Sequence, residues 1–323
     1  MSANTSIIAK KIIQNLPWTP IEIQSSDDIP TGDMPGDKVK IGPQHIQKSL
    51  VIFPRLLELL LPALESNPQQ RAVVAVCGGS GVGKSEIASL ICLYLNRMGV
   101  SAYTLSGDNY PHRIPKYNDA ERLRVFRQAG IGGLIALGQY FEDRPEILRA
   151  LMRSGDDSNL DCAKVYPWLS HYQNAGRNGL KNYLGTHREI DFAELSGIVA
   201  QFKNGASTIF LKRMGREDAE LWYEAVDFQE KSVLVIEWTH GNNHNLQGVD
   251  IPILLNSTPQ ETLEHRRSRN RDGATDSPFT TMVLGIEQEM LVSQAVNAKV
   301  IVSKSGEILS YGDFMKRTFQ EFA

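Results

Sequence analysis

Residues 72 to 85 read AVVAVCGGSGVGKS, an apolar run that passes directly into a glycine-rich loop. Such a run is typical of a parallel strand that is buried on both faces of a sheet. The loop from Gly78 to Ser85 matches the pattern GxxxxGK[ST], and the residues from Lys84 to about Met98 predict a helix. A strand, a glycine loop and a helix in this order predict a phosphate-binding loop, or P-loop.

The residue types of this loop suit phosphate chemistry. Glycines let the backbone approach phosphate oxygens closely, and the helix N-terminus adds the positive end of a dipole. We expect Lys84 to reach the β- and γ-phosphates and the Ser85 hydroxyl to coordinate Mg²⁺. The predicted nucleotide-binding residues are Gly78, Gly79, Ser80, Gly81, Val82, Gly83, Lys84 and Ser85. No NKxD-type guanine-reading motif follows, so ATP is the default nucleotide; the alternative is a glycine-rich turn that matches the pattern by chance.

The composition is ordinary for a globular protein. Of 323 residues, 41% are hydrophobic and 22% charged, and the net charge is −3. This charge favours a small-molecule partner and no nucleic acid. The three cysteines lack the spacing of a zinc site or a secreted disulfide framework, and the first residues lack the order of a signal peptide. The apolar run from Leu50 to Leu64 is interrupted by prolines and charges and is too short to span a bilayer. We expect a cytoplasmic protein with no membrane partner.

Strands and helices alternate along much of the chain. Further strands are predicted at 100–105, 207–211, 233–238, 251–255 and 299–302, and further helices at 191–203, 259–269 and 280–298. This alternation predicts an α/β fold, a doubly wound parallel sheet with the core of a P-loop NTPase. Residues 25–42 read as loop, and 45–64 as one or two helical pieces, kinked or restarted at Pro54.

Four later stretches carry further motifs. They are SGDNYPHR at 106–113, DFAELSGIVAQFKNG at 191–205, VLVIEWTH at 233–240 and TLEHRRSRNRD at 262–272. Together with GGSGVGKS they resemble the phosphoribulokinase and uridine kinase family of P-loop kinases, from about Val73 to Val302. The resemblance implies a kinase that uses ATP and Mg²⁺ and transfers the γ-phosphoryl group to a hydroxyl of a nucleoside, sugar or sugar phosphate.

Asp108 follows the second predicted strand. The resemblance implies that Asp108 is the base toward the acceptor hydroxyl and that Tyr110, His112 and Arg113 help to bind the acceptor. A carboxylate at the carboxyl end of a strand beside the phosphate loop is well placed to orient a hydroxyl proton. The alternative is that Asp108 is a turn residue or a helix cap.

Glu237 ends the strand VLVIE, where a carboxylate can hold Mg²⁺ directly or through water. Ser85 and Glu237 are therefore the predicted metal ligands, although Glu237 could be an ordinary polar strand end. The family's glycine after this glutamate is replaced by Trp238. His240 is either a substrate contact, as the resemblance implies, or a structural histidine.

The stretch at 262–272 resembles the family's lid. Its Arg267 and Arg271 are the candidates to neutralise charge on the transferring group, a task suited to a permanently charged planar fork. Clustered arginines also occur on solvated helix faces. The glycine and arginine that often follow in this lid are not evident in GATDSP.

The acceptor is less well defined by the sequence. Positive charge follows Asp108 at Arg113, Lys116, Arg122, Arg124 and Arg127. These side chains could bind an anionic acceptor or form the exposed face of a helix from Asn118 to Gln128. Residues 130–185 match no motif of the family, and we expect them to hold the specificity.

These observations predict an N-terminal accessory segment at 1–70 and a P-loop kinase domain at 71–323, with an acceptor-binding insertion at 110–231. The accessory segment is expected to pack on the core rather than to perform chemistry. The predicted activity is phosphotransfer to an alcohol group, with Asp108, Lys84, Arg267 and Arg271 as catalytic residues. The alternatives are an NTPase that drives a protein partner and a nucleotide-binding regulatory protein without turnover. The sequence leaves the oligomeric state open, and a homodimer is one of the states it allows.

Overall fold

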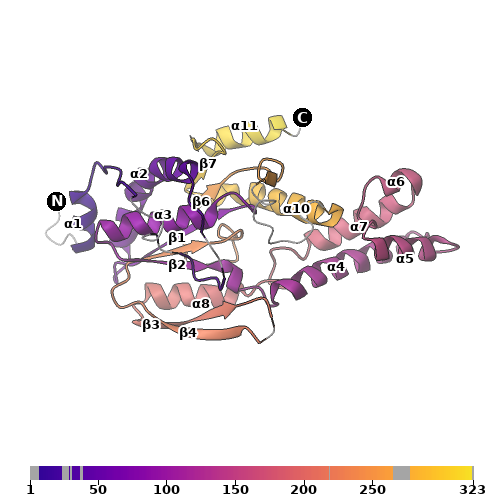
Figure 1. Cartoon of the computed structure of the whole chain (residues 1–323), viewed down its shortest axis with the longest axis horizontal. Coiled ribbons are helices and arrows are strands. Elements are labelled where there is room, and N and C mark those ends of the chain that lie inside the picture. Colours follow the sequence, from indigo (N-terminus) through magenta and orange to yellow (C-terminus); the bar gives the residue numbers. More distant parts are fainter. Residues whose placement is uncertain are drawn as a thin grey trace. The chain divides into compact units, whose positions relative to one another are not determined.

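The structure is a computed structural model that describes residues 7–23, 29, 31–36, 39–217, 219–264 and 277–321, with side chains as far as 318 (Figure 1). Contacts divide the chain into two units. The first contains Met1–Tyr110, Asp191–Thr258 and Leu291–Ala323, and the second contains Pro111–Ile190 and Pro259–Met290. The predicted domain boundaries stay a prediction. The two units differ from those boundaries because the first unit contains 191–231 and the N-terminal segment together with the phosphate loop.

The first unit is built on a six-stranded sheet with the order β2-β5-β1-β6-β7-β8. Its strands are β1 (Ala72–Gly78), β2 (Ala102–Ser106), β5 (Val233–Glu237), β6 (Ile251–Leu255), β7 (Val300–Val302) and β8 (Ile308–Leu309). All neighbours are parallel except β7 and β8. The predicted α/β fold with a parallel sheet is confirmed.

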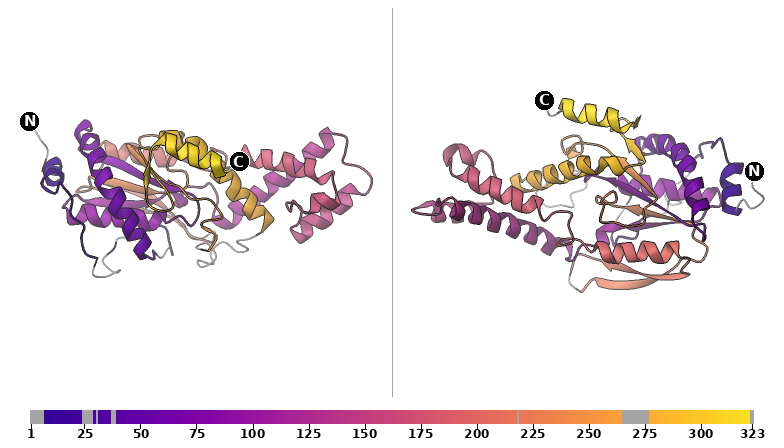
Figure 2. Two further views of the ribbon diagram at one scale, coloured as in Figure 1. Left: turned by 90° about the horizontal axis from the view of Figure 1, so that it is seen from above. Right: turned by 180° about the vertical axis from the view of Figure 1, so that it is seen from behind.

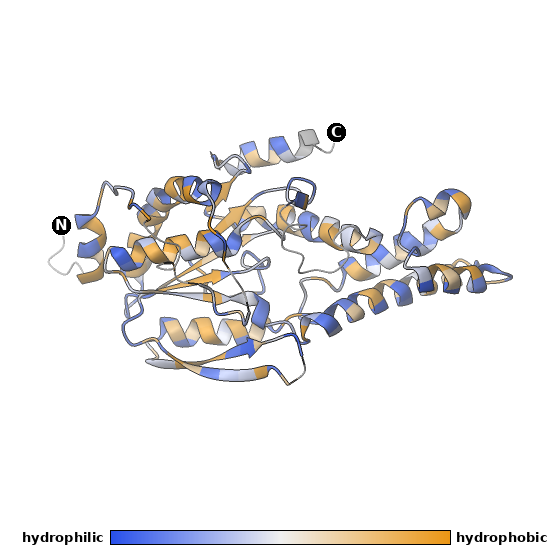
Figure 3. Ribbon diagram, viewed as in Figure 1, coloured by the Kyte–Doolittle hydropathy of each residue, from blue (hydrophilic) through white to orange (hydrophobic). Residues whose placement is uncertain are grey.

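Helices cover both faces of this sheet. Helices α2 (Pro43–Ser66) and α3 (Lys84–Arg97) form one core cluster with alternate residues of β1 and β6. Helix α8 (Phe192–Lys203) lies on the opposite side from α2, as Figure 1 and the right-hand view of Figure 2 show. The last turns of α10 (Pro278–Gln294) pack with Cys77 and Leu254. Covered on both sides, β1 is buried along its whole length and is hydrophobic throughout (Figure 3).

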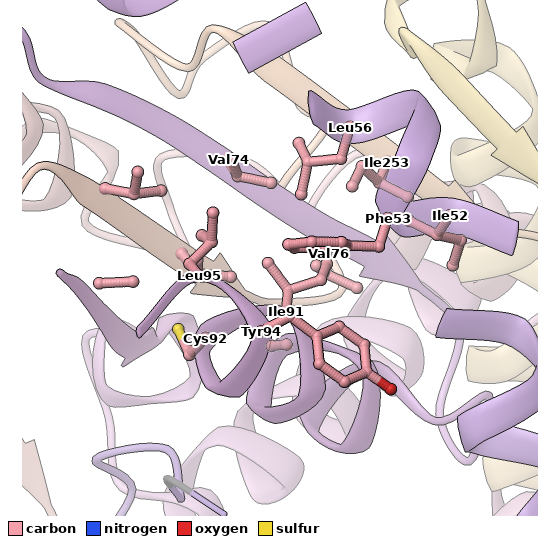
Figure 4. Packing of buried hydrophobic residues seen from close by; sticks show 14 of the residues in the cluster. Ile52, Phe53, Leu56, Val74, Val76, Ile91, Cys92, Tyr94, Leu95 and Ile253 are labelled. Atoms are coloured by element: carbon pink, nitrogen blue, oxygen red, sulfur yellow. The ribbon is translucent and has the colours of Figure 1, made fainter. Parts of the chain in front are cut away.

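Helix α2 joins the N-terminal part of the chain to this core. Phe53 is fully buried, and its ring centroid lies 4.8 Å from that of Trp18. Tyr94, which lies beside Phe53 in Figure 4, is 5.1 Å away by the same measure. Of the two predicted forms, one or two helical pieces, the structure has one, because α2 is a single helix that contains Pro54 and Pro62. Its apolar stripe buries several large side chains at about 1.5 to 3 kcal/mol each, which outweighs the cost of an internal proline.

A separate hairpin pairs β3 (Thr208–Met214) with β4 (Leu221–Asp227) in antiparallel register, with Arg213 opposite Trp222. Strand β3 extends the strand predicted at 207–211. Strand β4 was not predicted, because its residues are almost all exposed and its sequence LWYEAVD lacks the alternation of a half-buried strand.

The described part of the second unit is helical. It contains α4 (Pro115–Ala136), α5 (Arg144–Ser154), α6 (Cys162–Val165), α7 (Leu169–Lys181) and the first part of α10. Phe126 of α4 meets Tyr172 of α7 edge to face at 5.4 Å. The two terminal helices of the chain's described part are α1 (Ile7–Gln14) and α11 (Tyr311–Glu321), both in the first unit. None of the described helices is both long enough and apolar enough to cross a membrane.

Candidate phosphoryl-transfer site

The phosphate loop connects β1 to α3 as predicted. Gly78 has φ +148°, and a Cβ there would lie 2.5 Å from the carbonyl oxygen of Leu255, so no other residue fits. Lys84 begins α3, and its Nζ donates to the carbonyl oxygen of Gly79 at 3.1 Å. The lysine therefore folds back over the loop, where its charge can meet phosphate oxygens.

Glu237 lies at the centre of the site because β5 lies between β1 and β2. In the sheet register Glu237 is opposite Val76 on one side and Ser106 on the other. The Ser85 hydroxyl donates to Oε2 of Glu237 at 3.0 Å, and the Ser106 hydroxyl donates to Oε1. The residue is 4% exposed. Burial, with the negative charge of Asp108 as the second cause, raises the pKa of Glu237 to about 8.

These oxygens fit a magnesium ion. A hydroxyl and a carboxylate are oxygen ligands of the kind that Mg²⁺ takes, and here the two are hydrogen-bonded to each other. A buried carboxylate with a raised pKa also gains a counter-charge when a cation binds. Among the described residues no group of three or more His, Cys, Asp and Glu side chains is arranged to hold a metal. A magnesium ion here would therefore take its remaining ligands from phosphate and water, as is usual at nucleotide sites.

Asp108 is the middle residue of a short 3₁₀ turn, η2 (Gly107–Asn109), at the carboxyl end of β2. Asp108 is exposed, while Gly107 and Asn109 on either side of it are buried. Its charge acts on Glu237, so the two carboxylates are neighbours. The turn thus presents one carboxylate to solvent next to the predicted metal ligand.

Trp238 explains why this turn contains a glycine. A Cβ on Gly107 would lie only 2.0 Å from Cγ of Trp238, so the indole packs directly on the glycine backbone. Trp238 is 2% exposed and also contacts the ring of Phe192 at 5.5 Å. The family has a glycine where this chain has Trp238. The larger side chain fits here because Gly107, which it packs on, has no side chain of its own.

Asp33 holds the same turn from the N-terminal segment, a role that sequence analysis missed. Its Oδ1 accepts the backbone N–H of Ser106 at 2.6 Å and the side-chain amide of Asn109 at 3.3 Å. Its Oδ2 accepts from Arg213 Nη1 at 2.9 Å and from the Tyr103 hydroxyl at 3.1 Å. Burial raises the pKa of Asp33, and the charge of Arg213 opposes that rise. The only sequence signal was an aspartate in a turn-rich stretch, which does not reveal a partner 180 positions away.

His45 also approaches the site from the N-terminal segment. The backbone N–H of Gly42 donates to Nδ1 of His45 at 3.0 Å, which leaves the proton of a neutral ring on Nε2. A Cβ on Gly83 would lie 3.2 Å from this Nε2. A donor from α2 therefore lies beside the phosphate loop, and no motif in the sequence indicated it.

The predicted acceptor-binding residues fall into both units. In the first unit Tyr110 is fully buried, and burial raises its pKa far above the usual range. His240 is 5% exposed and meets the Trp238 ring edge-on at 5.1 Å. In the second unit a ring nitrogen of His112 lies 2.9 Å from the His187 carbonyl oxygen, and Arg113 donates to the Tyr183 hydroxyl at 3.1 Å. The acceptor roles of these four residues stay predictions.

Most of the arginines after Asp108 are engaged within the second unit. Arg122 Nε lies 2.6 Å from a carboxylate oxygen of Glu189, and Arg127 pairs with Asp157 at 2.9 Å. Arg124 pairs with Glu121 along the surface of α4. Protein carboxylates thus occupy these arginines, and only Arg124, at 57% exposure, fits the interpretation as an exposed helix face. The predicted lid residues Arg267 and Arg271 lie outside the described residues.

The buried cysteines are not candidates for chemistry. Burial raises the pKa of Cys77 and of Cys92 to about 12, so both thiols stay protonated at neutral pH.

No family model matches the sequence. Two curated proteins do. The chain is 39% identical over 254 residues to the bifunctional alpha-galactosidase/sucrose kinase AgaSK of Mediterraneibacter gnavus, which covers 79% of the chain and 22% of the relative. It is 27% identical over 180 residues to the bifunctional enzyme NodQ of Rhizobium tropici, which covers 50% of the chain and 27% of that relative. The chain spans about a quarter of the length of these curated relatives.

Solved structures resemble the fold more distantly. A D-glycerate 3-kinase from Cryptococcus neoformans is 13% identical with a TM-score of 0.45, covering 84% of this chain and 99% of that one. A possible uridine kinase from Bacillus stearothermophilus is 12% identical with a TM-score of 0.39, covering 76% and 98%. The match to the relative named a sucrose kinase supports the predicted resemblance to a kinase.

Proposed function

We propose that this chain, as a relative of P-loop kinases of the phosphoribulokinase and uridine kinase kind, is an ATP- and Mg²⁺-dependent kinase that phosphorylates a hydroxyl of a small molecule. The observation that carries the proposal is the pair of carboxylates at the end of two adjacent strands. Glu237 is buried against Ser85, while Asp108 is exposed beside it. One carboxylate suits a metal and the other suits an acceptor hydroxyl.

The residues divide the work of phosphoryl transfer between them. The loop amides and Lys84 bind the phosphates, and Ser85 and Glu237 would hold Mg²⁺, which neutralises charge on the β- and γ-phosphates. Asp108 orients the acceptor hydroxyl and accepts its proton as the phosphoryl group moves. Asp33 and Trp238 keep the turn that carries Asp108 in place. Catalysis of this kind is mainly positioning and electrostatic stabilisation.

The Mediterraneibacter gnavus relative supports a kinase and points to a sugar as the first acceptor class to test. Its printed name combines an alpha-galactosidase with a sucrose kinase. Glycoside hydrolysis uses a pair of carboxylates and no nucleotide, whereas phosphoryl transfer uses a loop such as Gly78 to Ser85. The match therefore fits the kinase part of that protein.

The decisive experiment measures ADP release and phosphorylated product with ATP and Mg²⁺ across sugars, nucleosides and sugar phosphates. Lys84→Ala is the blank, because removal of the loop lysine should lower turnover at least ~100-fold. Acceptor-dependent ADP release by the wild type alone supports the kinase. ADP release without any acceptor, stimulated by a protein, would instead support an NTPase, and nucleotide-dependent stabilisation without turnover would support a regulatory binding protein.

A further inference from the structure

A cavity of about 540 Å³ that is wide open to solvent lies in the first unit between the N-terminal segment and the β3–β4 hairpin. One wall is Gly32 to Pro35, and the other is formed by the hairpin, with Arg213, Trp222 and Glu224 among its lining residues. Small-molecule sites usually measure ~300 to 1,000 Å³, so the cavity has the size of a ligand site.

We propose that this cavity binds the acceptor and that the acceptor is an uncharged sugar. The proposal rests on the proposed kinase function and deepens it, because it selects one of the three acceptor classes and gives that class a site.

The charge of the cavity argues against a phosphorylated acceptor. Arg213 is the one cation among the described lining residues, and they include the carboxylates of Asp33, Glu224 and Asp227. Arg213 is already engaged: Nε donates to Glu224 at 3.0 Å, Nη1 to Asp33 at 2.9 Å and Nη2 to the Tyr103 hydroxyl at 3.1 Å. Because all three nitrogens of the Arg213 guanidinium already donate to protein acceptors, this side chain cannot form the paired hydrogen bonds by which arginine binds a phosphate.

The hydrogen-bonding groups favour a sugar over a nucleoside. Asp33 already accepts four hydrogen bonds, from Ser106, Asn109, Arg213 and Tyr103, but the exposed residues Glu224 and Asp227 each accept through one oxygen in the described part of the chain. The remaining carboxylate oxygens are acceptors, whereas the main donors of the lining, Arg213 and Tyr103, are spent on the protein. A sugar presents a hydroxyl donor on almost every carbon, whereas a nucleobase presents several lone pairs that need donors. Trp222 adds a half-exposed indole, at 44% exposure, whose face can cover the C–H side of a sugar ring.

The cavity adjoins the transfer site through two of its lining residues. Asp33 lines the cavity and also bonds Ser106 and Asn109, which flank the turn residue Asp108. Gly32 lines it as well, and a Cβ on Gly32 would lie 3.9 Å from Oε1 of Glu237. A sugar against this wall therefore lies next to the turn that carries the proposed base, with Asp33 acting as a positioning residue.

The test compares Trp222→Ala with the matched control Phe210→Ala. Phe210 is a 64% exposed aromatic residue of the same hairpin and is not part of the cavity lining. With sucrose as the probe, Trp222→Ala should raise the KM for the sugar at least tenfold and leave the KM for ATP and the kcat within about threefold. Phe210→Ala should change none of these values. Should Trp222→Ala fail to fold, Met34→Trp narrows the cavity from the opposite wall with the same expected rise.

Each other outcome is also decisive. An unchanged sugar KM in both cavity variants overturns the site and leaves the kinase intact. Transfer to glucose 6-phosphate, but to no neutral sugar, overturns the acceptor class and again leaves the kinase intact. If no acceptor is phosphorylated, saturation-transfer NMR with sucrose separates the two proposals: a signal that Trp222→Ala abolishes supports the sugar site while the kinase fails, and no signal overturns the site.

Discussion

The carboxylate of Asp33 and the guanidinium of Arg213 lie 2.9 Å apart, although 180 positions separate the two residues in the chain. Both side chains are almost fully buried, at 8% and 5% exposure. The pair links the N-terminal segment to the β3–β4 hairpin, and Asp33 extends the link to the turn that carries Asp108.

Removing one partner of this pair should be costly. Asp33→Asn leaves Arg213 with less compensation, and the loss of one partner of a buried pair typically costs about 3 to 5 kcal/mol. We expect urea denaturation to show destabilisation near the lower end, because Glu224 still pairs with Arg213 at 3.0 Å. Arg213→Met alone should behave similarly, and the double variant should be clearly less destabilised than the sum. Additive losses would show that the two side chains do not interact.

Gly107 and Trp238 should form a mutually dependent pair. Gly107→Ala places a methyl group 2.0 Å from the indole, so the turn or the ring must move. A displacement of about 1 Å at the turn can cost ~100-fold in turnover. Trp238→Gly alone should lower turnover as well, because it removes a buried support of the turn, but in that background Gly107→Ala should cost far less than in the wild type. An equal loss from Gly107→Ala in both backgrounds would contradict this packing constraint.

Asp108→Asn should separate catalysis from nucleotide binding. The exposed carboxylate is proposed to take the acceptor proton, a contribution that is typically worth ~100- to 10,000-fold. We expect that loss in kcat, with the Kd for ATP unchanged in a calorimetric titration. Asp119→Asn is a suitable control, because Asp119 is an exposed aspartate of α4 that lies outside the proposed site. Unchanged transfer by Asp108→Asn would remove Asp108 from the mechanism.

Glu237 should give the metal-free protein an unusual pH dependence. Its pKa is raised from 4.5 to about 8 in the folded state, so the folded state binds the proton more tightly than the unfolded state. The stabilisation is present in full below pH 4.5 and is lost as the pH rises to about 8, by at most about 5 kcal/mol. With EDTA present, Glu237→Gln should flatten this part of the profile of unfolding free energy. Parallel profiles for both proteins would rule out the raised pKa.

Phe53 should be one of the main anchors of helix α2. It is fully buried between the rings of Trp18 and Tyr94. We expect Phe53→Ala to lower the free energy of unfolding by about 3 to 5 kcal/mol because it leaves a cavity in the core. Val51→Ala is the matched control on the same helix, since Val51 is 41% exposed, and it should cost less than about 0.5 kcal/mol.

The parts of the molecule that the sequence predicted well are those with local patterns. Strand β1 and the phosphate loop are specified by a continuous apolar run and by fixed glycine spacing, so both appear where they were predicted. The carboxyl end of β5 was also predicted, because Glu237 ends an apolar strand. Each of these signals lies within about ten consecutive residues.

The parts that were missed depend on distant contacts. Nothing local distinguishes Asp33 from any other aspartate in a loop, and its importance arises only from Ser106 and Arg213. The sequence left open whether the helix restarts at Pro54, because the burial that outweighs the local cost of this proline is tertiary. The grouping of α8 and the β3–β4 hairpin with the main sheet also rests on contacts between distant segments, while the predicted domain boundaries stay a prediction.

The position of β5 between β1 and β2 has a consequence for synthesis of the protein. The two strands that flank β5 end at Gly78 and Ser106, whereas β5 begins only at Val233. During translation β1 and β2 therefore emerge with no partner between them while more than a hundred further residues are made, and their unpaired edges are open to wrong pairing. Ser85 and Glu237 come together to form the nucleotide site only after β5 has been inserted between β1 and β2. A ribosome-bound chain should thus acquire nucleotide binding in a single late step, which makes ATP itself a probe of when this sheet closes.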